Sequence, residues 1–454
     1  MESIGAALNA FSRFMWGPPM VALLVGGGIF FVLHSRGLPY RHFRHAFVII
    51  TGKFDNSSGD QGDISHFKAL TTALSGTLGL GNITGVAVAI TVGGPGAVFW
   101  MWVTAVLGIA TKFYTATLAV MFRGYDDAGH LQGGPMYVIR EGLGRRWLPL
   151  AWLFALGGLF GTLPIFQINQ LVQVMRDVVA IPAGITSADD HFTFDLLSGI
   201  VLSGLVFAVI VGRIQRIATV TSRIVPFMVA FYLLMTAVLL FKNAPEIPGA
   251  LALIVSDAFS GSAAAGGVIG TVIMIGVQRG AFSNEAGIGT EALAHGAART
   301  NEPVREGLVA MIGPVADTLI VCSCTAIAIL VTGAWQGDAV GVTMTSEAYE
   351  HAFPGFGGLL LAIMVFFLSF STVLTFSYYG SKCMGFLFGT RFENWYIVFY
   401  IALIVVGAIA SLRAVIGLID GMYATMAIPT MISTLLLAPK VRHAALDYFR
   451  RHNY

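Results

Sequence analysis

Long apolar runs constrain the fold of this sequence more than any other feature. A helix needs about 20 mostly apolar residues to cross a bilayer. Eleven segments approach or exceed this length, at residues 14–34, 66–92, 96–121, 149–177, 195–212, 217–241, 264–293, 305–333, 357–381, 394–411 and 413–437. Of the 454 residues, 56% are hydrophobic and 11% are charged, whereas soluble chains average about 25% charged. The sequence therefore predicts an all-α polytopic membrane protein, with residues 1–454 forming a single transmembrane domain.

Composition excludes several other classes of protein. The net charge of +2 gives no indication of a nucleic-acid partner. The three cysteines, Cys322, Cys324 and Cys383, lie in or beside apolar segments, so we interpret them as buried small residues rather than disulfide or zinc ligands. The first apolar run lacks a cleavage site, so we expect a retained helix. The chain should contact membrane lipid throughout.

The positions of lysine and arginine predict the orientation in the membrane. If the end of the first segment is cytoplasmic, most of the 26 basic residues fall on the cytoplasmic side. This predicts an odd number of crossings, with the N-terminus outside and residues 438–454 forming a basic cytoplasmic tail. Lys68, Lys112 and Arg223 lie inside segment ends, and we expect their side chains to snorkel.

Glycines interrupt the second segment. Ser75–Gly85 holds four glycines, and each glycine inside a helix costs about 1 kcal/mol relative to alanine. In a bilayer the freed N–H and C=O groups also find no water, so a break is tolerated where the backbone lines a cavity or binds a ligand. We expect a binding site here.

The chain divides into two similar halves after an extra N-terminal helix at 14–34. The halves, 66–241 and 264–437, are nearly equal in length, and five helices in each require the second to run inverted. Each begins with an interrupted segment, at Gly76–Gly85 and Arg279–Thr290. Paired interruptions in corresponding positions indicate a transporter binding site near the midplane. The alternative is that the glycines only allow tight helix crossing.

The second break carries charges in an apolar segment, where each needs a partner or a cavity. One interpretation makes Ser283 and Asn284 face a ligand, with Glu285 as a structural or gating charge. The other is that the segment ends early, with Arg279 and Glu285 in a wet vestibule.

Other polar residues leave two interpretations open. Asp317 would suit a sodium ion or a proton, because hard cations prefer oxygen ligands, but it could also join helices. Asp420 poses the same choice. The hydroxyls of Ser371 and Thr372 could bind an ion or their own helix backbone. Gln167, near Asn169 and Gln170, could face a substrate or cap a helix end.

Enzyme motifs are missing from the sequence. We find no His-Glu-x-x-His, no Gly-x-Ser-x-Gly and no nucleotide-binding loop. We therefore expect neither enzymatic activity nor an organic cofactor, and we expect any transport to be driven by an ion gradient. A channel is less favoured, because no ring of repeated charged motifs is present.

Long motifs resemble those of the alanine or glycine:cation symporter family. They are Gly62-Asp-Ile-Ser-His-Phe-Lys-Ala-Leu, Gly79-Leu-Gly-Asn-Ile-Thr-Gly-Val-Ala, Gly93-Gly-Pro-Gly-Ala-Val-Phe-Trp-Met-Trp, Gly133-Gly-Pro-Met-Tyr, Arg279-Gly-Ala-Phe-Ser-Asn-Glu-Ala-Gly and Ser377-Tyr-Tyr-Gly. The resemblance implies a LeuT-type fold in a bacterial or archaeal cytoplasmic membrane. It also implies uptake of small neutral amino acids driven by sodium, or by protons in some members.

The resemblance also implies a set of site residues. The N–H groups of Leu80 and Gly81 would bind the substrate carboxylate. Phe282, Ser283 and Asn284 would contact its amino group or side chain, and Gln167 fits the family's Gln-x-Asn pattern. Ser75 and Leu78 carbonyls with Ser371 and Thr372 hydroxyls match one sodium site, and Thr77 and Asn82 match a second.

The sequence departs from the family pattern in three stretches near the expected pocket. Leu80 stands where threonine is common, Gln170 where a small residue is common, and Thr375-Phe376 where Gly-Trp is expected. Thr375 would narrow the pocket and Phe376 would widen it. These departures leave the substrate open.

Overall fold

The computed structural model describes residues 2–54, 59–260, 269–410 and 413–452. They form a helical bundle with one small antiparallel sheet of β1 (Gly124–Tyr125) and β2 (Leu131–Gln132). The helices up to the middle of the chain are α1 (Glu2–Met15), α2 (Pro18–His34), α3 (Leu38–Arg41), α4 (Phe43–Val48), α5 (His66–Thr77), α6 (Thr84–Gly93), α7 (Ala97–Met121), α8 (Pro135–Tyr137), α9 (Leu148–Gly161), α10 (Ile165–Met175), α11 (Phe192–Ile210) and α12 (Arg213–Lys242).

The later helices are α13 (Ile247–Ser260), α14 (Ile269–Asn284), α15 (Glu291–Gly296), α16 (Pro303–Ala310), α17 (Ile312–Pro314), α18 (Ser323–Val331), α19 (Val342–Ala352), α20 (Gly357–Phe388), α21 (Glu393–Ile409) and α22 (Arg413–Arg451). Short 3-10 and π turns connect or extend them at η1 (Ile49–Lys53), η2 (Leu80–Asn82), η3 (Val138–Leu143), η4 (Arg145–Trp147), η5 (Arg176–Ala180), η6 (Ala244–Glu246), η7 (Val315–Cys322), η8 (Ala334–Gln336) and η9 (Thr390–Phe392).

The predicted crossings can be compared with these helices. Nine helical stretches of the described residues are long and apolar enough to cross a membrane, and each overlaps a predicted segment. The bent pair α5–α6 makes a tenth. Predicted segment 264–293 begins outside the described residues and continues as α14, a turn and α15. The count of eleven and the inverted repeat stay predictions.

Both predicted breaks are present. Helix α5 ends at Thr77, η2 forms a single 3-10 turn, and α6 leaves it at an angle of 59° to α5. The second break is shorter than predicted, because α14 continues through Arg279 to Asn284. The turn that follows has positive φ angles at Glu285 (56°), Gly287 (88°) and Gly289 (92°). Only glycine adopts this conformation without strain, which explains why two glycines end the helix here.

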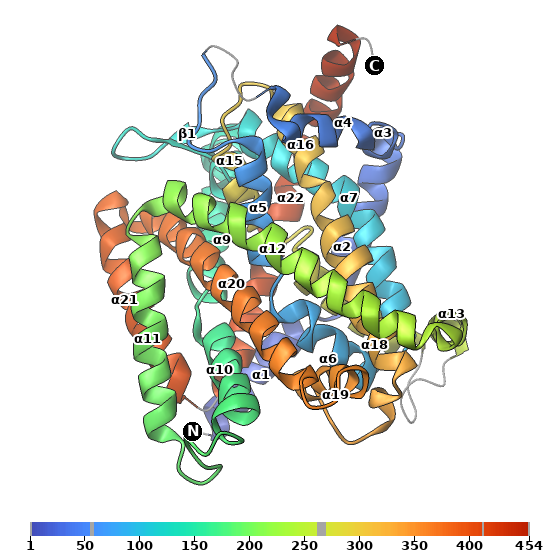
Figure 1. Cartoon of the computed structure of the whole chain (residues 1–454). Helices are drawn as coiled ribbons and strands as arrows, with labels where there is room; N and C mark the ends of the chain where they lie inside the picture. The colour runs from blue at the N-terminus through green and yellow to red at the C-terminus, as the bar shows by residue number, and fades with distance from the viewer. Residues whose placement is uncertain (1, 55–58, 261–268, 411–412, 453–454) are drawn as a thin grey trace.

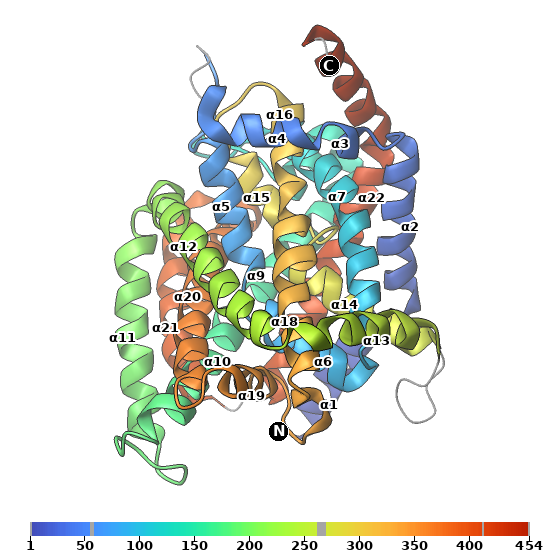
Figure 2. The ribbon, with the colours of Figure 1, turned by 45° about the vertical axis from the view of Figure 1, so that its right-hand side comes forward.

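The breaks meet in the interior of the bundle, where a Cβ on Gly81 would lie 3.5 Å from the Phe282 ring. Helix α12 crosses in front of them (Figure 1). In Figure 2, α3 and α4 lie across one end of the bundle, and α13 and α19 lie across the other. The sequence predicted none of these four helices. The two chain ends lie at opposite ends of the bundle, and α22 continues as a helix through most of the predicted tail, to Arg451 (Figure 1).

Lys112 contradicts its predicted position. Its side chain is only 1% exposed and does not snorkel. The Nζ atom lies beside Gly313, where an added Cβ would come within 3.1 Å. The glycine at position 313, in α17, therefore leaves room for a buried cation inside the bundle.

One end of the bundle joins the two broken segments directly. Ile64, before α5, forms a parallel bridge with Ala298, after α15. The Arg123 guanidinium then donates to the carbonyls of Gly296 (2.8 Å), Thr300 (2.9 Å), Gln61 (3.1 Å) and Ala298. We call this arrangement the Arg123 clamp.

A buried acid reinforces the clamp. The Glu306 carboxylate on α16 lies 2.5 Å from Nδ1 of His66 and 2.7 Å from Nδ1 of His295, which belong to α5 and α15. All three side chains are buried. The ends of α5 and α15 are therefore tied both through backbone and through side chains.

We predict that Arg123→Gln lowers the apparent melting temperature of the detergent-solubilised protein by several degrees. Each hydrogen bond to a charged group contributes about 1.5–3 kcal/mol, and the substitution removes several of them. Arg146→Gln is the matched control, because Arg146 is exposed on the η4 turn. Equal melting temperatures for the two variants would contradict the clamp.

Candidate functional site

A small cavity lies between the two breaks. Its volume is about 20 Å³, about the space of one water molecule. Its walls come from both breaks and from α9, α10, α20, α22 and the loop between α9 and α10, through Gly76, Thr77, Gly79, Gly81, Gly161, Leu163, Phe166, Gln167, Phe282, Glu285, Phe376, Ile419 and Tyr423. An amino acid would fit only if these walls moved apart. We call this the central cavity.

The first break leaves backbone donors without a partner among the described residues, and one of them belongs to the cavity residue Gly81. Leu80 and Gly81 are the first residues of η2, so their N–H groups have no acceptor within that turn. The neighbouring Gly79 N–H instead donates to Oδ1 of Asn82 at 3.0 Å. A Cβ on Gly79 would approach the Thr372 hydroxyl to 2.8 Å, so glycine is needed for this close packing.

Asn82 connects the first break to the second and to η7. Its Nδ2 donates to a carboxylate oxygen of Asp317 and lies 3.3 Å from the Ser283 hydroxyl. The other carboxylate oxygen of Asp317 accepts from Ser283 and from Thr318, each at 2.7 Å. All four side chains are fully buried. Asp317 is therefore stabilised by neutral donors from three elements.

Oxygen atoms of α5 and α20 meet at the predicted first sodium site. The Thr372 hydroxyl donates to the Ser75 carbonyl at 2.9 Å, and the hydroxyls of Ser75 and Thr375 contact each other. The Ser371 hydroxyl donates to Leu368 in its own helix at 3.1 Å. Ser75 and Thr372 are thus brought together, whereas the contacts of the Ser371 hydroxyl are with its own helix and, at 3.8 Å, with a methionine sulfur.

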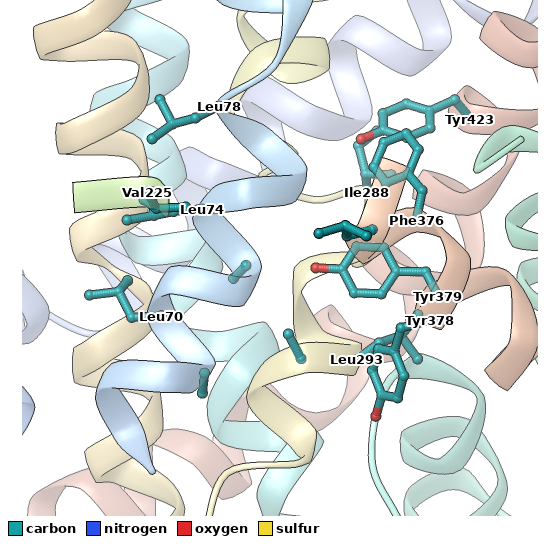
Figure 3. Packing of buried hydrophobic residues seen from close by; sticks show 14 of the residues in the cluster. Leu70, Leu74, Leu78, Val225, Ile288, Leu293, Phe376, Tyr378, Tyr379 and Tyr423 are labelled. Carbon is teal, nitrogen blue, oxygen red and sulfur yellow. The ribbon is translucent and has the colours of Figure 1, made fainter. Parts of the chain in front are cut away.

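Leu78 and Thr77 lie on different sides of the same helix end. The Leu78 side chain is buried and points to the side opposite the cavity residues Phe376 and Tyr423 (Figure 3). Thr77 lines the cavity, and its hydroxyl donates to Leu74 at 3.3 Å. Within the described residues, no three His, Cys, Asp or Glu side chains gather around a possible metal position. A cation here would depend on hydroxyl, amide and carbonyl oxygens.

Half of the predicted substrate residues line the cavity. Gly81, Gln167, Phe282 and Phe376 do so, and Oε1 of Gln167 is buried without a hydrogen-bond partner among the described residues. Nearby, Asn169 instead donates to the carbonyls of Gly407 and Ala410, which ties α10 to α21. Gln167 therefore faces the cavity, which agrees with the interpretation that it faces a substrate rather than capping a helix end.

The other predicted substrate residues face elsewhere. Ser283 bonds Asp317, and the Asn284 amide donates to the Thr318 hydroxyl at 3.2 Å. Thr375 contacts Ser75, and the Leu80 side chain is buried outside the cavity wall. These side chains support the breaks and do not touch the space between them.

The three candidate carboxylates separate into different environments. Glu285 lines the cavity and Asp317 lies behind it, in the Asn82 network. Asp420 is half-buried; its backbone carbonyl accepts from Trp16, and its charged neighbour is Arg279. Asp420 thus belongs to the packing of α22 against the N-terminal helices.

Sequence reasoning missed several wall residues. Tyr423 packs against Phe282 with ring centroids 5.2 Å apart and against Phe376 at 6.5 Å. Phe166 directly precedes Gln167, so the cluster of amide side chains that pointed to Gln167 could also have pointed to Phe166. Tyr423 follows Asp420 by three residues, and nothing in the surrounding apolar sequence distinguishes this tyrosine from one that packs in the core.

A larger space, of about 580 Å³, opens at the end of the bundle that holds the Arg123 clamp. We call this space the vestibule. Charged groups line it, including Asp63, Arg213, Lys382 and Glu393. Its inner wall includes Ser377 and Tyr378, directly after the cavity residue Phe376. Figure 3 shows Tyr379 between Phe376 and Tyr378, with Ile288 and Leu293 alongside. This apolar layer separates the vestibule from the central cavity.

We predict that Gly79→Ala weakens binding of labelled alanine by about tenfold or more, because the added methyl must displace the Thr372 hydroxyl or the turn. Gly85→Ala is the control, since its Cβ would meet nothing within 4 Å. It should bind alanine as the wild type does. Equal binding by both variants in equilibrium dialysis would show that the close approach at Gly79 has no role.

Comparisons with known proteins point in the same direction as this geometry. The family profile described as "Sodium:alanine symporter family" matches residues 1–454. "Sodium/alanine symporter AgcS" of Methanococcus maripaludis is 42% identical over 439 residues, covering 95% of this chain and 94% of that protein. "Probable sodium/glutamine symporter GlnT" of Bacillus subtilis is 32% identical over 439 residues, covering 96% and 89%.

A solved structure shares the fold at low sequence identity. The crystal structure of MhsT in complex with L-phenylalanine superposes with a TM-score of 0.56 and 11% identity, over 86% of this chain and 99% of that one. This likeness shows a LeuT-like arrangement of helices and nothing about the ligand. The full-length family match confirms the resemblance that the motifs carried. The chain therefore belongs to the sodium:alanine symporter family and is a membrane transporter, not an enzyme.

Proposed function

We propose that this protein is a sodium-coupled symporter that carries a small neutral amino acid, of the alanine and glycine class, across the cytoplasmic membrane by alternating access. One observation carries the proposal. At the first break, the N–H groups of Leu80 and Gly81 have no hydrogen-bond acceptor among the described residues, Gly81 lines the central cavity, and the nearby Ser75 carbonyl accepts from the Thr372 hydroxyl. Donors for an anion and oxygens for a cation therefore lie on the same broken helix.

The substrate carboxylate would bind the N–H groups of Leu80 and Gly81. These donors lead into α6, so the positive end of that helix dipole adds to their attraction. The side chain would face Phe166, Phe282 and Phe376. Large rings around so small a space favour a short, uncharged side chain. The names of AgcS and GlnT also indicate neutral amino acids among the relatives.

Sodium would bind where Ser75 and Thr372 meet, with the Leu78 carbonyl and Ser371 completing the shell. A second cation would bind near Asp317, beside Asn82 and Thr77. Binding of the first ion offsets the repulsion between gathered oxygen atoms and so favours the conformation that accepts the zwitterion. By thermodynamic linkage, sodium raises the substrate affinity by the same factor by which the substrate raises the sodium affinity.

Alternating access would use the vestibule for release. The vestibule opens at the end that the basic residues predict to be cytoplasmic, and in this proposal the N-terminus lies outside and the C-terminus inside. Separation of Tyr378, Tyr379 and Leu293 would connect it to the central cavity. We propose that the two halves, 66–241 and 264–437, act as the inverted repeats that rock against each other.

Proton coupling is the second candidate, and Asp317 favours it. A fully buried carboxylate held by neutral donors could exchange a proton during the transport cycle. The gradient that drives uptake separates the two possibilities.

We predict that purified protein in proteoliposomes accumulates labelled alanine when sodium is imposed outside, and that a pH gradient alone drives little uptake. Absence of accumulation under either gradient would reject the symporter proposal. Uptake driven by the pH gradient without sodium would select proton coupling.

Substitutions at the proposed sodium site test it separately from substrate transport. Thr372→Val and Asn82→Ala should each abolish sodium-dependent thermal stabilisation, and Ser371→Ala should do so if its hydroxyl turns toward the ion. Thr434→Val is the control, because its hydroxyl bonds Thr430 in the same helix at 2.7 Å. Wild-type sodium response in both Thr372→Val and Asn82→Ala would reject the assignment.

A further inference from the structure

Glu285 is the charged side chain that lines the central cavity. It is 1% exposed and follows directly after α14, where its N–H donates to the Ala281 carbonyl at 3.0 Å. Its φ of 56° is unusual for a residue that is not glycine. Such conformations are strained and persist where the surroundings fix them. The strained backbone directs this carboxylate to the cavity.

Two hydroxyl groups hold the carboxylate in place. The Tyr423 hydroxyl donates to Oε1, and the Thr290 hydroxyl donates to Oε2. Each carboxylate oxygen has a second acceptor site, so both can still accept another hydrogen bond. Glu285 forms no salt bridge with any described residue; Lys112, on α7, acts on it from beyond 4 Å. The charge is oriented but not locally neutralised.

The central cavity therefore has a positive wall and a negative wall on opposite sides. At one wall, Gly79 and Gly81 mark the start of η2 and α6, the positive end of a helix. At the other, Glu285 stands at the carboxyl end of α14, where the helix dipole is negative. A zwitterionic amino acid has the same separation of charge, with its carboxylate and ammonium on one carbon atom.

We propose that Glu285 is the counter-charge for the ammonium group of the substrate, with Oε1 of Gln167 as a second acceptor. This inference rests on the proposed function and names a recognition residue within it. An ammonium group transferred from water into an apolar bundle is costly unless it is paired. The unpartnered, buried Oε1 of Gln167 lines the same cavity and points to a missing donor.

The assignment differs from recognition by backbone carbonyls alone. Backbone carbonyls accept hydrogen bonds from a hydroxyl group as well as from an ammonium group, and they favour the ammonium by charge assistance alone. An ionised carboxylate discriminates, because it gains a full charge pair with the ammonium and only a hydrogen bond with the hydroxyl. The site would then select α-amino acids over α-hydroxy acids of the same size.

The test compares L-alanine with L-lactate, which carries a hydroxyl in place of the ammonium. Binding to the detergent-solubilised full-length protein is measured in saturating sodium by competition with labelled alanine. We expect the wild type to prefer alanine strongly. In Glu285→Gln, alanine affinity should fall by about thirtyfold or more, and the preference for alanine over lactate should collapse.

Glu291→Gln is the matched control. Glu291 is equally buried on the same segment, bonds Thr115 at 3.1 Å and does not line the cavity, so its loss should leave the alanine-to-lactate preference unchanged. Sodium-dependent thermal stabilisation without substrate should remain in Glu285→Gln, which separates a recognition role from a folding role. If Glu285→Gln does not fold, Glu285→Asp decides, because it should bind alanine more weakly yet keep the preference over lactate.

The outcomes distinguish this inference from the proposed function. Wild-type affinity and selectivity in Glu285→Gln would overturn the role of Glu285 alone, as would loss of the preference in Glu285→Asp. Binding of no neutral amino acid by the wild type, across alanine, glycine, serine and glutamine, would overturn the proposed function and this inference with it.

Discussion

The whole arrangement depends on satisfying the backbone where a helix stops inside a membrane. Lipid offers no hydrogen bonds, so each exposed N–H or C=O group must find a protein partner. Asn82 supplies this at the first break: its Oδ1 accepts from Gly79, and its own carbonyl accepts from the Thr325 hydroxyl at 2.8 Å. The N–H groups of Leu80 and Gly81 are left as the donors that we propose for the substrate carboxylate. The proposed binding site therefore consists of the backbone donors that Asn82 does not cap.

The same side chain makes the two breaks mechanically dependent on each other. Nδ2 of Asn82 reaches Asp317, which also accepts from Ser283 on α14. At the end of the bundle, the Arg123 clamp and Glu306 join α5 to α15. The broken segments are thus connected at their centre and at one end. A ligand that shifts one break shifts the other, because packed interiors change between discrete arrangements rather than deforming gradually.

The sequence predicted the positions of the two helix breaks better than it predicted which side chains at the breaks face the cavity. Glycine spacing located both interruptions, since the backbone cost of glycine is local. Side-chain direction is not local: successive helical residues differ by about 100°, and only tertiary packing fixes which one faces a cavity. Phe282 and Glu285 therefore face the central cavity, whereas Ser283 and Asn284 bond η7. Burial of Lys112 depended on Gly313, 201 positions later in the chain, and no pattern near Lys112 could reveal it.

Formal charge explains why a cation would be required before the substrate. Among the described residues at the breaks, the carboxylates of Asp317 and Glu285 are buried, and the buried ammonium group of Lys112 acts on both of them. Negative charge in excess is costly in an apolar bundle. A substrate carboxylate would add to it, although the ammonium beside Glu285 would offset part of the cost. Sodium bound at Ser75 and Thr372, or near Asp317, lowers the excess first. On this argument the acids set the order of binding, and the glycines of η2 only provide the place where the substrate carboxylate docks.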